Sequence, residues 1–350
     1  MPNIRTIAAA MTAGAAALAS GGAGATETKG ALYADLRVSV DYTDDKSPLA
    51  GPTWTLTDNN SIWGVKGSSV KGGVTVFGGY ERFISADEEA LPGFPLELTR
   101  QAYLGAAGFC GTVKVGKHGT AYADAGRKID PFYNTAASGA GGLTTAGSVL
   151  GGGNSHGSST AFNADFLGST FVANQLAYTS PAWKDFTGNV ALFLDESNTS
   201  NQDHGYGVGV EYMSGGLTAG IQYIGAQNAN AATWGADVDA RRLYASYADR
   251  RFGAGVSWEH LGTPLADADF MMLSGWYGLF ENTRIAASLG LEDGSAFEGT
   301  SLRVGVFHDV LDSFTVWAAA RNYDDSSGVA VDAMVVTFGA GYKFSLGFTQ

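Results

Sequence analysis

The residues Leu32–Tyr42 alternate without interruption between apolar and polar side chains. Leu32, Leu36 and Val40 fall on one face, and Asp35 and Arg37 fall on the other. Such a period of two is the signature of a β-strand whose two faces meet different environments. Strands of soluble proteins are more typically about five or six residues long. A tilted strand that crosses a bilayer needs about 9–11 residues, so the length of this run favours a membrane-spanning strand.

The same alternation returns along the chain, notably over residues 208–212, 254–259, 284–292 and 334–344. We count about sixteen such strands, within the range of outer-membrane barrels. Short glycine-containing turns (70–73 and 214–216) separate some of them, and longer polar loops separate others (44–60, 195–204 and 226–239). Short turns at one end and long loops at the other are typical of outer-membrane barrels.

The composition agrees with strands that face two media. Charged residues make up only 16 % of the chain, against about 25 % in ordinary soluble domains, and there are 50 glycines. No stretch outside the N-terminus approaches eighteen consecutive apolar residues, so a membrane form of this chain must be a closed barrel. Residues 1–25 carry Arg5, an alanine-rich apolar run and a small-residue cleavage site, and are predicted to be a signal peptide that precedes an outer-membrane barrel domain over 26–350.

A long segment at about 118–167 shows no convincing helix or strand pattern, and its second half is rich in Gly, Ser, Thr and Ala. Roughly fifty residues without regular structure far exceed the usual connection in a compact domain, and such loops are functional or disordered. We therefore predict an all-β fold, a transmembrane antiparallel β-barrel of about sixteen strands, with this third long loop folded into the lumen.

Several stretches resemble the trimeric general porins of Gram-negative bacteria, in the same order along the chain. The stretch 32–41 looks like the opening strand of that family, and 63–67 and 100–105 look like its second and fourth. The stretches 111–117 and 130–132 resemble the fifth strand and the entry to the third loop, 174–181 the next strand, and 339–344 the closing strand. The resemblance implies sixteen strands per barrel, a homotrimer in the outer membrane, and a third loop that forms an eyelet in which acidic loop residues face a basic wall.

When the eyelet residues of that family are matched one by one to this sequence, only some of the basic positions carry a basic residue. Arg100 and Lys66 stand where the family has basic residues, but Asp35 stands where a basic residue is usual, and Ile62 where an arginine is common. The residues predicted to line the pore and its constriction are Asp35, Arg37, Lys66, Glu81, Arg100, Lys114, Asp124 and Asp130. With these charges nearly balanced and the whole chain at −13, we expect a weak preference for cations.

The expected partners are outer-membrane lipid and the small hydrophilic solutes and ions that diffuse through the pore. The acidic balance argues against nucleic acid as a partner. The single cysteine, Cys110, excludes a disulfide framework, and the five scattered histidines show no metal-binding spacing. We predict no cofactor, no metal and no catalytic group.

Two alternatives within the same fold stay open at this stage. One is a substrate-selective channel, and the other is a structural or adhesive barrel whose lumen is plugged by the glycine- and serine-rich stretch. The C-terminus also departs from the family pattern, because six residues follow Phe344. Either Phe348 serves as the terminal aromatic residue, or the tail lies in the periplasm.

Overall fold

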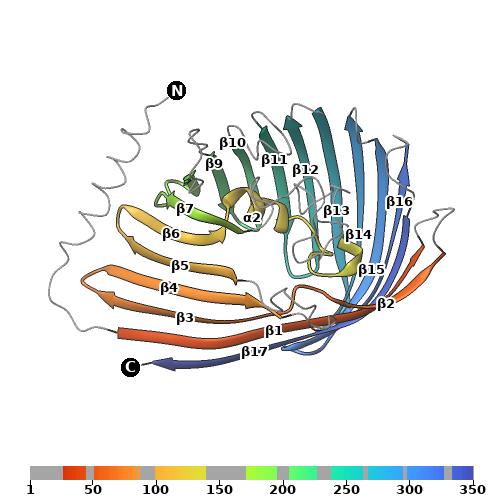
Figure 1. The fold of residues 1–350 in the computed structure, drawn as a ribbon, viewed down its shortest axis with the longest axis horizontal. Helices are drawn as coiled ribbons and strands as arrows, with labels where there is room; N and C mark the ends of the chain where they lie inside the picture. Colours follow the sequence, from red (N-terminus) through yellow and green to blue (C-terminus); the bar gives the residue numbers. More distant parts are fainter. Residues whose placement is uncertain are drawn as a thin grey trace, which may run out of the picture.

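The computed structural model describes residues 27–44, 51–84, 86, 99–138, 171–194, 205–226, 238–262, 267–294, 298–326 and 333–349. These residues form one antiparallel sheet that closes on itself through the pairing of its first and last strands (Figure 1). Its strands are β1 (Glu27–Asp44), β2 (Thr53–Asp58), β3 (Ile62–Lys71), β4 (Val74–Phe83), β5 (Thr99–Gly108), β6 (Gly111–Gly119), β7 (Phe171–Thr179), β8 (Phe186–Phe193), β9 (Gly205–Ser214), β10 (Leu217–Ala226), β11 (Val238–Ala248), β12 (Phe252–Gly262), β13 (Asp267–Phe280), β14 (Thr283–Gly294), β15 (Gly299–Leu311), β16 (Phe314–Asp325) and β17 (Ala333–Thr349).

Seventeen described strands fill sixteen positions of the barrel, because β2 and β3 both pair with β1. β3 pairs with the first half of β1, up to Asp35, and β2 pairs with its second half, from Val38 onward. The predicted antiparallel barrel of about sixteen strands is therefore confirmed. Among the described residues, no helix combines the length and the apolar character needed to cross a membrane.

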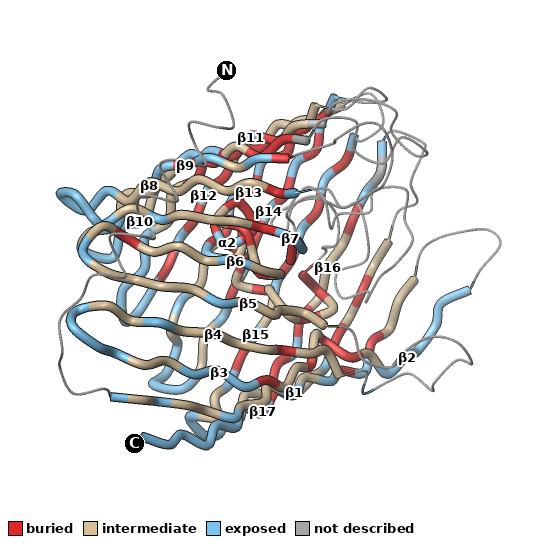
Figure 2. Tube along the Cα trace, turned by 60° about the vertical axis from the view of Figure 1, so that its left-hand side comes forward, coloured by how far each residue is buried: buried red, intermediate tan, exposed pale blue. Residues whose placement is uncertain are grey.

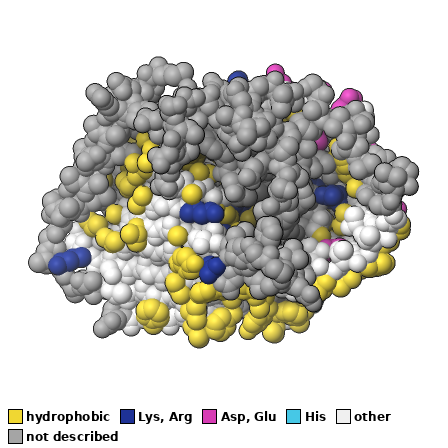
Figure 3. Space-filling view, in the orientation of Figure 1, with side chains coloured by type: hydrophobic (Ala, Val, Ile, Leu, Met, Phe, Trp, Pro, Cys, Tyr) yellow, Lys and Arg dark blue, Asp and Glu magenta, His cyan; other side chains and the backbone are white. Residues whose placement is uncertain are grey.

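The alternation of the first strand sets the two faces of the wall as predicted. Val38 and Val40 are 36 % and 45 % exposed on the outer face, whereas Ser39 and Asp41 between them are 2 % and 3 % exposed on the inner face. In Figure 2 buried and exposed positions alternate along strands such as β12 and β13. Figure 3 shows hydrophobic side chains gathered along the lower edge, where β1 and β17 run in Figure 1. Lipid-facing apolar side chains around a polar interior are the arrangement expected of a membrane barrel.

Two of the predicted loops contain regular structure. The segment predicted as a polar loop over 44–60 includes β2, whose Trp54 and Leu56 are exposed on the outer face. β1 is 18 residues long, and its second half needs a hydrogen-bonding neighbour beyond the end of β3. β2 supplies that neighbour, which removes an open sheet edge.

The predicted constriction loop begins with the helix α2 (Ala121–Arg127) and continues to the short 3₁₀ helix η1 (Ala136–Ser138). The prediction that this part has no helix is wrong. Thr120 caps α2, since its hydroxyl accepts the backbone N–H of Ala123 at 3.1 Å. A helix this short is not stable alone, and buried Tyr122, Ala123 and Ala125 supply the packing that holds it. Residues 139–167 of the predicted loop lie outside the described residues, as does the predicted signal peptide.

The chain after Phe344 continues β17 without a break. Residues up to Thr349 pair with β1, with Phe348 opposite Gly30 and Leu346 opposite Leu32. Gly30 leaves room for the ring of Phe348, which lies where a side chain at that position would be. The additional residues thus lengthen the last strand against the first.

Candidate functional site

The segment 120–138 lies against inward-facing side chains of the barrel wall, and Figure 1 draws α2 on the inner side of the strands. The first attachment joins α2 to β11 and β12. Arg242 donates to the backbone carbonyl of Tyr122 at 2.8 Å and to the carboxylate of Glu259 at 2.7 Å. The hydroxyl of Tyr122 donates to the same carboxylate. Burial and the neighbouring Glu259 raise the pKa of the Tyr122 hydroxyl, so it remains a donor at neutral pH.

The second attachment follows the end of the helix. Lys128 forms an ion pair with Glu211 of β9, and the hydroxyl of Tyr244 donates to the same carboxylate. The side chain of Ile129 packs with Met272 in a small buried cluster, and its backbone carbonyl accepts the hydroxyl of Ser274 at 2.5 Å. Polar and apolar contacts therefore hold the same short piece of chain.

The third attachment is on β15 and β16. Arg303 donates to the carbonyl of Ser138 at 2.9 Å and lies 3.5 Å from the carboxylate of Asp130, and both side chains are buried. Burial raises the pKa of Asp130 even though Arg303 acts in the opposite direction. Beside this pair, Phe132 packs into a cluster with Phe307 and Trp317. The segment is thus bound to the wall by buried charges and by an aromatic core.

Near the start of the segment, Arg100 of β5 forms an ion pair with Glu81 of β4. Glu81 also accepts the hydroxyl of Tyr33 at 2.8 Å, and it is 4 % exposed. The guanidinium of Arg100 lies 4.1 Å from the ring centroid of Phe171, and that of Arg127 lies 4.9 Å from the same ring. Two cations therefore share one aromatic ring near the start of the segment.

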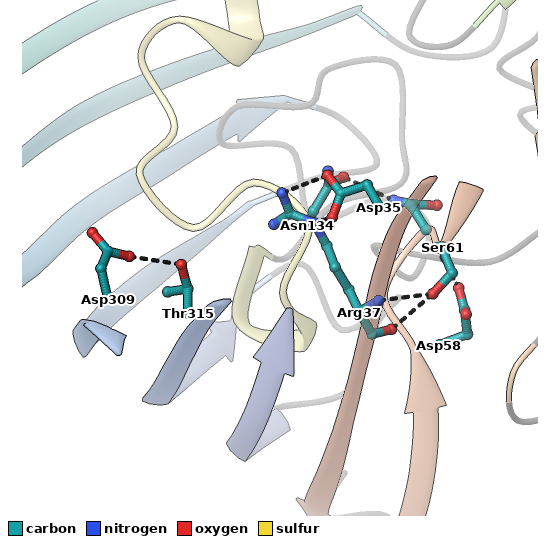
Figure 4. Close-up of polar contacts among 8 residues, drawn as sticks. Asp35, Arg37, Asp58, Ser61, Asn134, Asp309 and Thr315 are labelled. Atoms are coloured by element: carbon teal, nitrogen blue, oxygen red, sulfur yellow. Dashed lines mark hydrogen bonds and ion pairs between the residues drawn. The ribbon is translucent and has the colours of Figure 1, made fainter. Parts of the chain in front are cut away.

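A wide part of the lumen, with a cavity volume of 770 Å³, lies between the segment and strands β14 to β17 and β1. We call it the vestibule, and its charged lining residues are Asp35, Arg37, Glu281, Arg284, Asp309, Asp312 and Lys343. Arg37 binds Asp35 through two hydrogen bonds of 2.9 Å, and Asp309 accepts the hydroxyl of Thr315 at 2.6 Å (Figure 4). Among the described residues, neither Arg284 nor Lys343 forms an ion pair.

The segment also returns to the wall beside the vestibule. Asn60, between β2 and β3, donates to the side-chain carbonyl of Asn134 at 3.1 Å. Figure 4 shows Asn134 close to Asp35 and Arg37, with Ser61 bonded to the backbone of Arg37. The segment therefore has contacts on several sides of the barrel.

The eight predicted pore residues fall into separate groups. Asp35 and Arg37 form one pair and Glu81 and Arg100 another, and Lys66 lies 5.2 Å from the centroid of the Tyr33 ring, whose hydroxyl joins the second pair. Lys114 and Asp124 line the same small cavity, where Asp124 is bonded to Arg127 at 2.7 Å. Asp130 lies apart with Arg303.

Sequence reasoning did not single out the wall residues that hold the segment, namely Glu211, Arg242, Glu259 and Arg303. A usable signal was present, because each lies at an inward position of an alternating strand. Arg303, for example, stands between Leu302 and Val304, which are 52 % and 50 % exposed on the outer face. A charge between two lipid-facing residues must point inward. Among the described residues, no three His, Cys, Asp or Glu side chains gather in a way that could hold a metal ion.

Comparison with known proteins identifies this arrangement. The sequence profile of the Gram-negative porin family matches residues 6–347. No curated protein sequence matches the chain. An anion-selective porin from Comamonas acidovorans is similar in structure, with a TM-score of 0.72 and 15 % identity over 91 % of this chain and 100 % of that one.

Two further solved structures are similar over most of their length. OmpF of Salmonella typhi, in a complex with daunomycin, gives a TM-score of 0.68 with 14 % identity, and the match covers 89 % of this chain and 97 % of that one. The trimer form of OmpT, an outer-membrane protein of Vibrio cholerae, gives 0.63 with 17 % identity over 91 % and 99 %. At such identities these likenesses concern the fold.

Proposed function

The chain belongs to the Gram-negative porin family and is a non-enzymatic general diffusion channel of the outer membrane, and we propose that the segment after β6 narrows its pore and gives it a weak preference for cations. Diffusion through such a pore is passive. Small hydrophilic solutes and ions pass according to size and to the charge at the narrow point.

The observation that carries this proposal is the path of residues 120–138 along the inner wall. Their contacts run from β11 and β12, through β15, to the junction of β2 and β3. This path supports a segment that occupies part of the lumen and leaves the vestibule beside it. We accordingly propose pore-lining roles for Asp35, Arg37, Lys66, Glu81, Arg100, Lys114 and Asp124, and for Asp130 a role in fixing the constriction through its buried contact with Arg303.

The selectivity we propose is weak because most of the assigned carboxylates are neutralised. Asp35, Glu81, Asp124 and Asp130 are each within an ion pair, with Arg37, Arg100, Arg127 and Arg303 respectively. The formal charge of −13 favours cations at the pore mouths, although salt screens charges separated by more than about 10 Å at 0.1 M ionic strength. The net negative charge therefore sets the direction of the preference, and ion pairing and screening by salt keep it small.

We also propose that the chain assembles as a homotrimer. The resemblance to general porins supports this, and a similar structure, that of OmpT, is described as a trimer form. Light scattering of the detergent-solubilised protein would measure the mass directly. A mass of a single chain plus detergent under mild conditions would contradict the trimer without affecting the channel.

The test of the channel is conductance in a planar bilayer, followed by the zero-current potential under a KCl gradient. We expect discrete large openings and a potential of the sign that cation preference produces. A potential of the opposite sign would reject the cation preference and keep the pore. Folded protein that conducts no current would reject the open channel in favour of a plugged structural or adhesive barrel.

Two substitutions test the proposed constriction within the same measurement. Arg100→Ala removes a cation and should shift the potential toward stronger cation preference, and Asp124→Ala should shift it the other way. Arg241→Ala is a suitable control, because Arg241 lies on the outer face next to inward-facing Arg242 and pairs with Asp239. Unchanged potentials in both pore variants would remove these residues from the constriction.

A further inference from the structure

The vestibule extends from the segment 120–138 to the end of the barrel that carries the short turns. Pro131 and Tyr133 of the segment line it at one end, and Asn282 and Ser313, in the turns after β13 and β15, line it at the other. A solute that passes the segment on this side therefore crosses the vestibule before it leaves the barrel. The cavity volume of 770 Å³ lies within the range of about 300–1,000 Å³ that is usual for small-molecule pockets.

Two opposite charges in the vestibule are neighbours without being paired. Arg284 of β14 pairs in the sheet with Phe307 of β15, and Asp309 follows Phe307 on the same face of that strand. Arg284 lies within electrostatic range of Asp309. The two side chains nevertheless form no ion pair, either with each other or with another described residue. Both residues are half-buried, so a solute in the cavity can reach them.

Each of the two charges is held by a contact of its own. The guanidinium of Arg284 lies 4.8 Å from the ring centroid of Phe307. One carboxylate oxygen of Asp309 accepts the hydroxyl of Thr315 at 2.6 Å (Figure 4), and the backbone N–H of Asp309 donates to the carbonyl of Asn282 at 2.8 Å. These contacts leave the second carboxylate oxygen of Asp309 and the N–H groups of Arg284 without a hydrogen-bond partner among the described residues.

The wall beside these two charges leaves room for a solute. Gly341 of β17 lies between Thr315 of β16 and Arg37 of β1, so this part of the lining has no side chain. The nearest other cation is itself occupied, because Arg37 binds Asp35 through two hydrogen bonds of 2.9 Å. Arg284 and Asp309 are therefore the charges of this part of the wall that are open to a ligand.

The closeness of the two charges restricts the ligand. A simple anion at Arg284 is repelled by Asp309, and a simple cation at Asp309 is repelled by Arg284. A solute with an ammonium group and a carboxylate a few bonds apart can donate to Asp309 and accept from Arg284 at the same time, through charge-assisted hydrogen bonds. From this geometry we propose that Arg284 and Asp309 form a subsite for small zwitterions of the amino-acid type on their way through the pore. The inference rests on the proposed channel function and adds a solute class to it.

The test is the reduction of single-channel KCl current by added L-serine, measured over a wide range of serine concentrations in about 0.1 M KCl. We expect the reduction to saturate, whereas glycerol, which is uncharged and of similar size, should lower the current only in proportion to its concentration. Salt shortens the Debye length from about 10 Å at 0.1 M to about 3 Å at 1 M, so about 1 M KCl should raise the half-saturating concentration of serine. A serine effect that stays proportional in a conducting channel overturns the subsite alone. A protein without KCl conductance would overturn the channel function instead.

Two variants test the pair of charges. Arg284→Gln and Asp309→Asn each remove one charge and keep a hydrogen-bonding side chain. Each should raise the half-saturating concentration of serine by about two- to fivefold, the value of one exposed ion pair. Each should also change the preferred ligand. Asp309→Asn keeps the cation and should respond to lactate, and Arg284→Gln keeps the carboxylate and should respond to ethanolamine. A merely structural role would produce no such exchange of ligands.

Lys343→Gln is the matched control. Lys343 is likewise a cation of the vestibule without an ion pair among the described residues, but it lies on β17, with β16 between it and Asp309. This variant should leave the half-saturating concentration of serine unchanged. An increase equal to that of Arg284→Gln would mean that the general field of the vestibule acts on serine, and would overturn the subsite. An unchanged half-saturation in both Arg284→Gln and Asp309→Asn would overturn it as well.

Discussion

The wall that holds the loop segment and the wall of the vestibule carry similar charges in different surroundings. At the first, Arg242 and Glu259 have side chains 0 % and 1 % exposed and are bonded to each other and to Tyr122. At the second, Arg284 and Lys343 line an open cavity without ion pairs among the described residues. The buried charges fix the position of a chain segment, whereas the solvated ones contribute to the field that a passing ion meets.

The difference follows from desolvation. A buried charge loses its hydration, so it is tolerated only with a partner, and removal of that partner leaves an uncompensated charge. A charge in a water-filled vestibule keeps its hydration and can be changed at little cost. Stability and selectivity should therefore respond to substitutions in different regions of the same inner wall.

The largest effect is expected for Glu259→Gln, which leaves Arg242 buried without its counter-charge. The free energy of unfolding should fall by about 3–5 kcal/mol. Denaturant unfolding of the refolded barrel in detergent micelles would measure this loss.

Asp239→Asn provides the comparison for this variant, because it breaks the pair formed by the neighbouring Arg241. The side chains of that pair are 56 % and 30 % exposed, so the loss should be about 0–1 kcal/mol. Equal losses in the two variants would show that burial does not distinguish the pairs.

A smaller effect is expected from the titration of Asp130. Because its folded-state pKa is raised above the ordinary value of 3.8, the folded protein binds this proton more tightly than the unfolded chain does. The contribution to stability is complete below the unfolded pKa and is lost as the pH rises through the folded pKa. Asp130→Asn has no such titration. The unfolding free energy of wild type minus that of the variant should therefore decrease as the pH rises from below 4 toward neutrality.

Unfolding in denaturant at several pH values in this range would measure that difference. A difference that increases with pH would mean that the attraction of Arg303 outweighs burial at Asp130. The contact of Asp130 with Arg303 on β15 would then behave as an ordinary ion pair.

The smallest effect on stability is expected in the vestibule. The guanidinium of Arg284 is half-buried and lies 4.8 Å from the ring centroid of Phe307, a contact worth about 0.5–2 kcal/mol. Arg284→Gln should cost no more than this. It should nevertheless shift the zero-current potential toward cations, because a cation is lost from the wall of the vestibule. A large loss of stability without a shift in potential would assign Arg284 to the structural part of the wall.

Much of the fold could be predicted from local pattern. The alternation in Leu32–Tyr42 predicted a long strand and its two faces, and Val38 and Ser39 lie on the faces expected of them. The short turns at 70–73 and 214–216 also lie where glycines predicted them, between β3 and β4 and between β9 and β10. The helix α2 was missed because seven residues carry too little periodicity to reveal a helix.

Only part of the candidate site could be predicted from the pattern of the sequence. Charged residues could be identified, and pairs on one strand or neighbouring strands, such as Asp35 with Arg37, follow from the strand pattern. The contact of Asp130 with Arg303 joins residues 173 positions apart in the sequence, and that of Tyr122 with Glu259 joins residues 137 apart.

By itself the sequence determined the strands, their inward and outward faces and the family, because alternation along a strand depends only on neighbouring residues. Only the tertiary structure decided which inward charges become anchors and which remain in water. Closure of the barrel brings distant strands and the loop segment together, and burial at those contacts is a property of the closed barrel that no single strand contains.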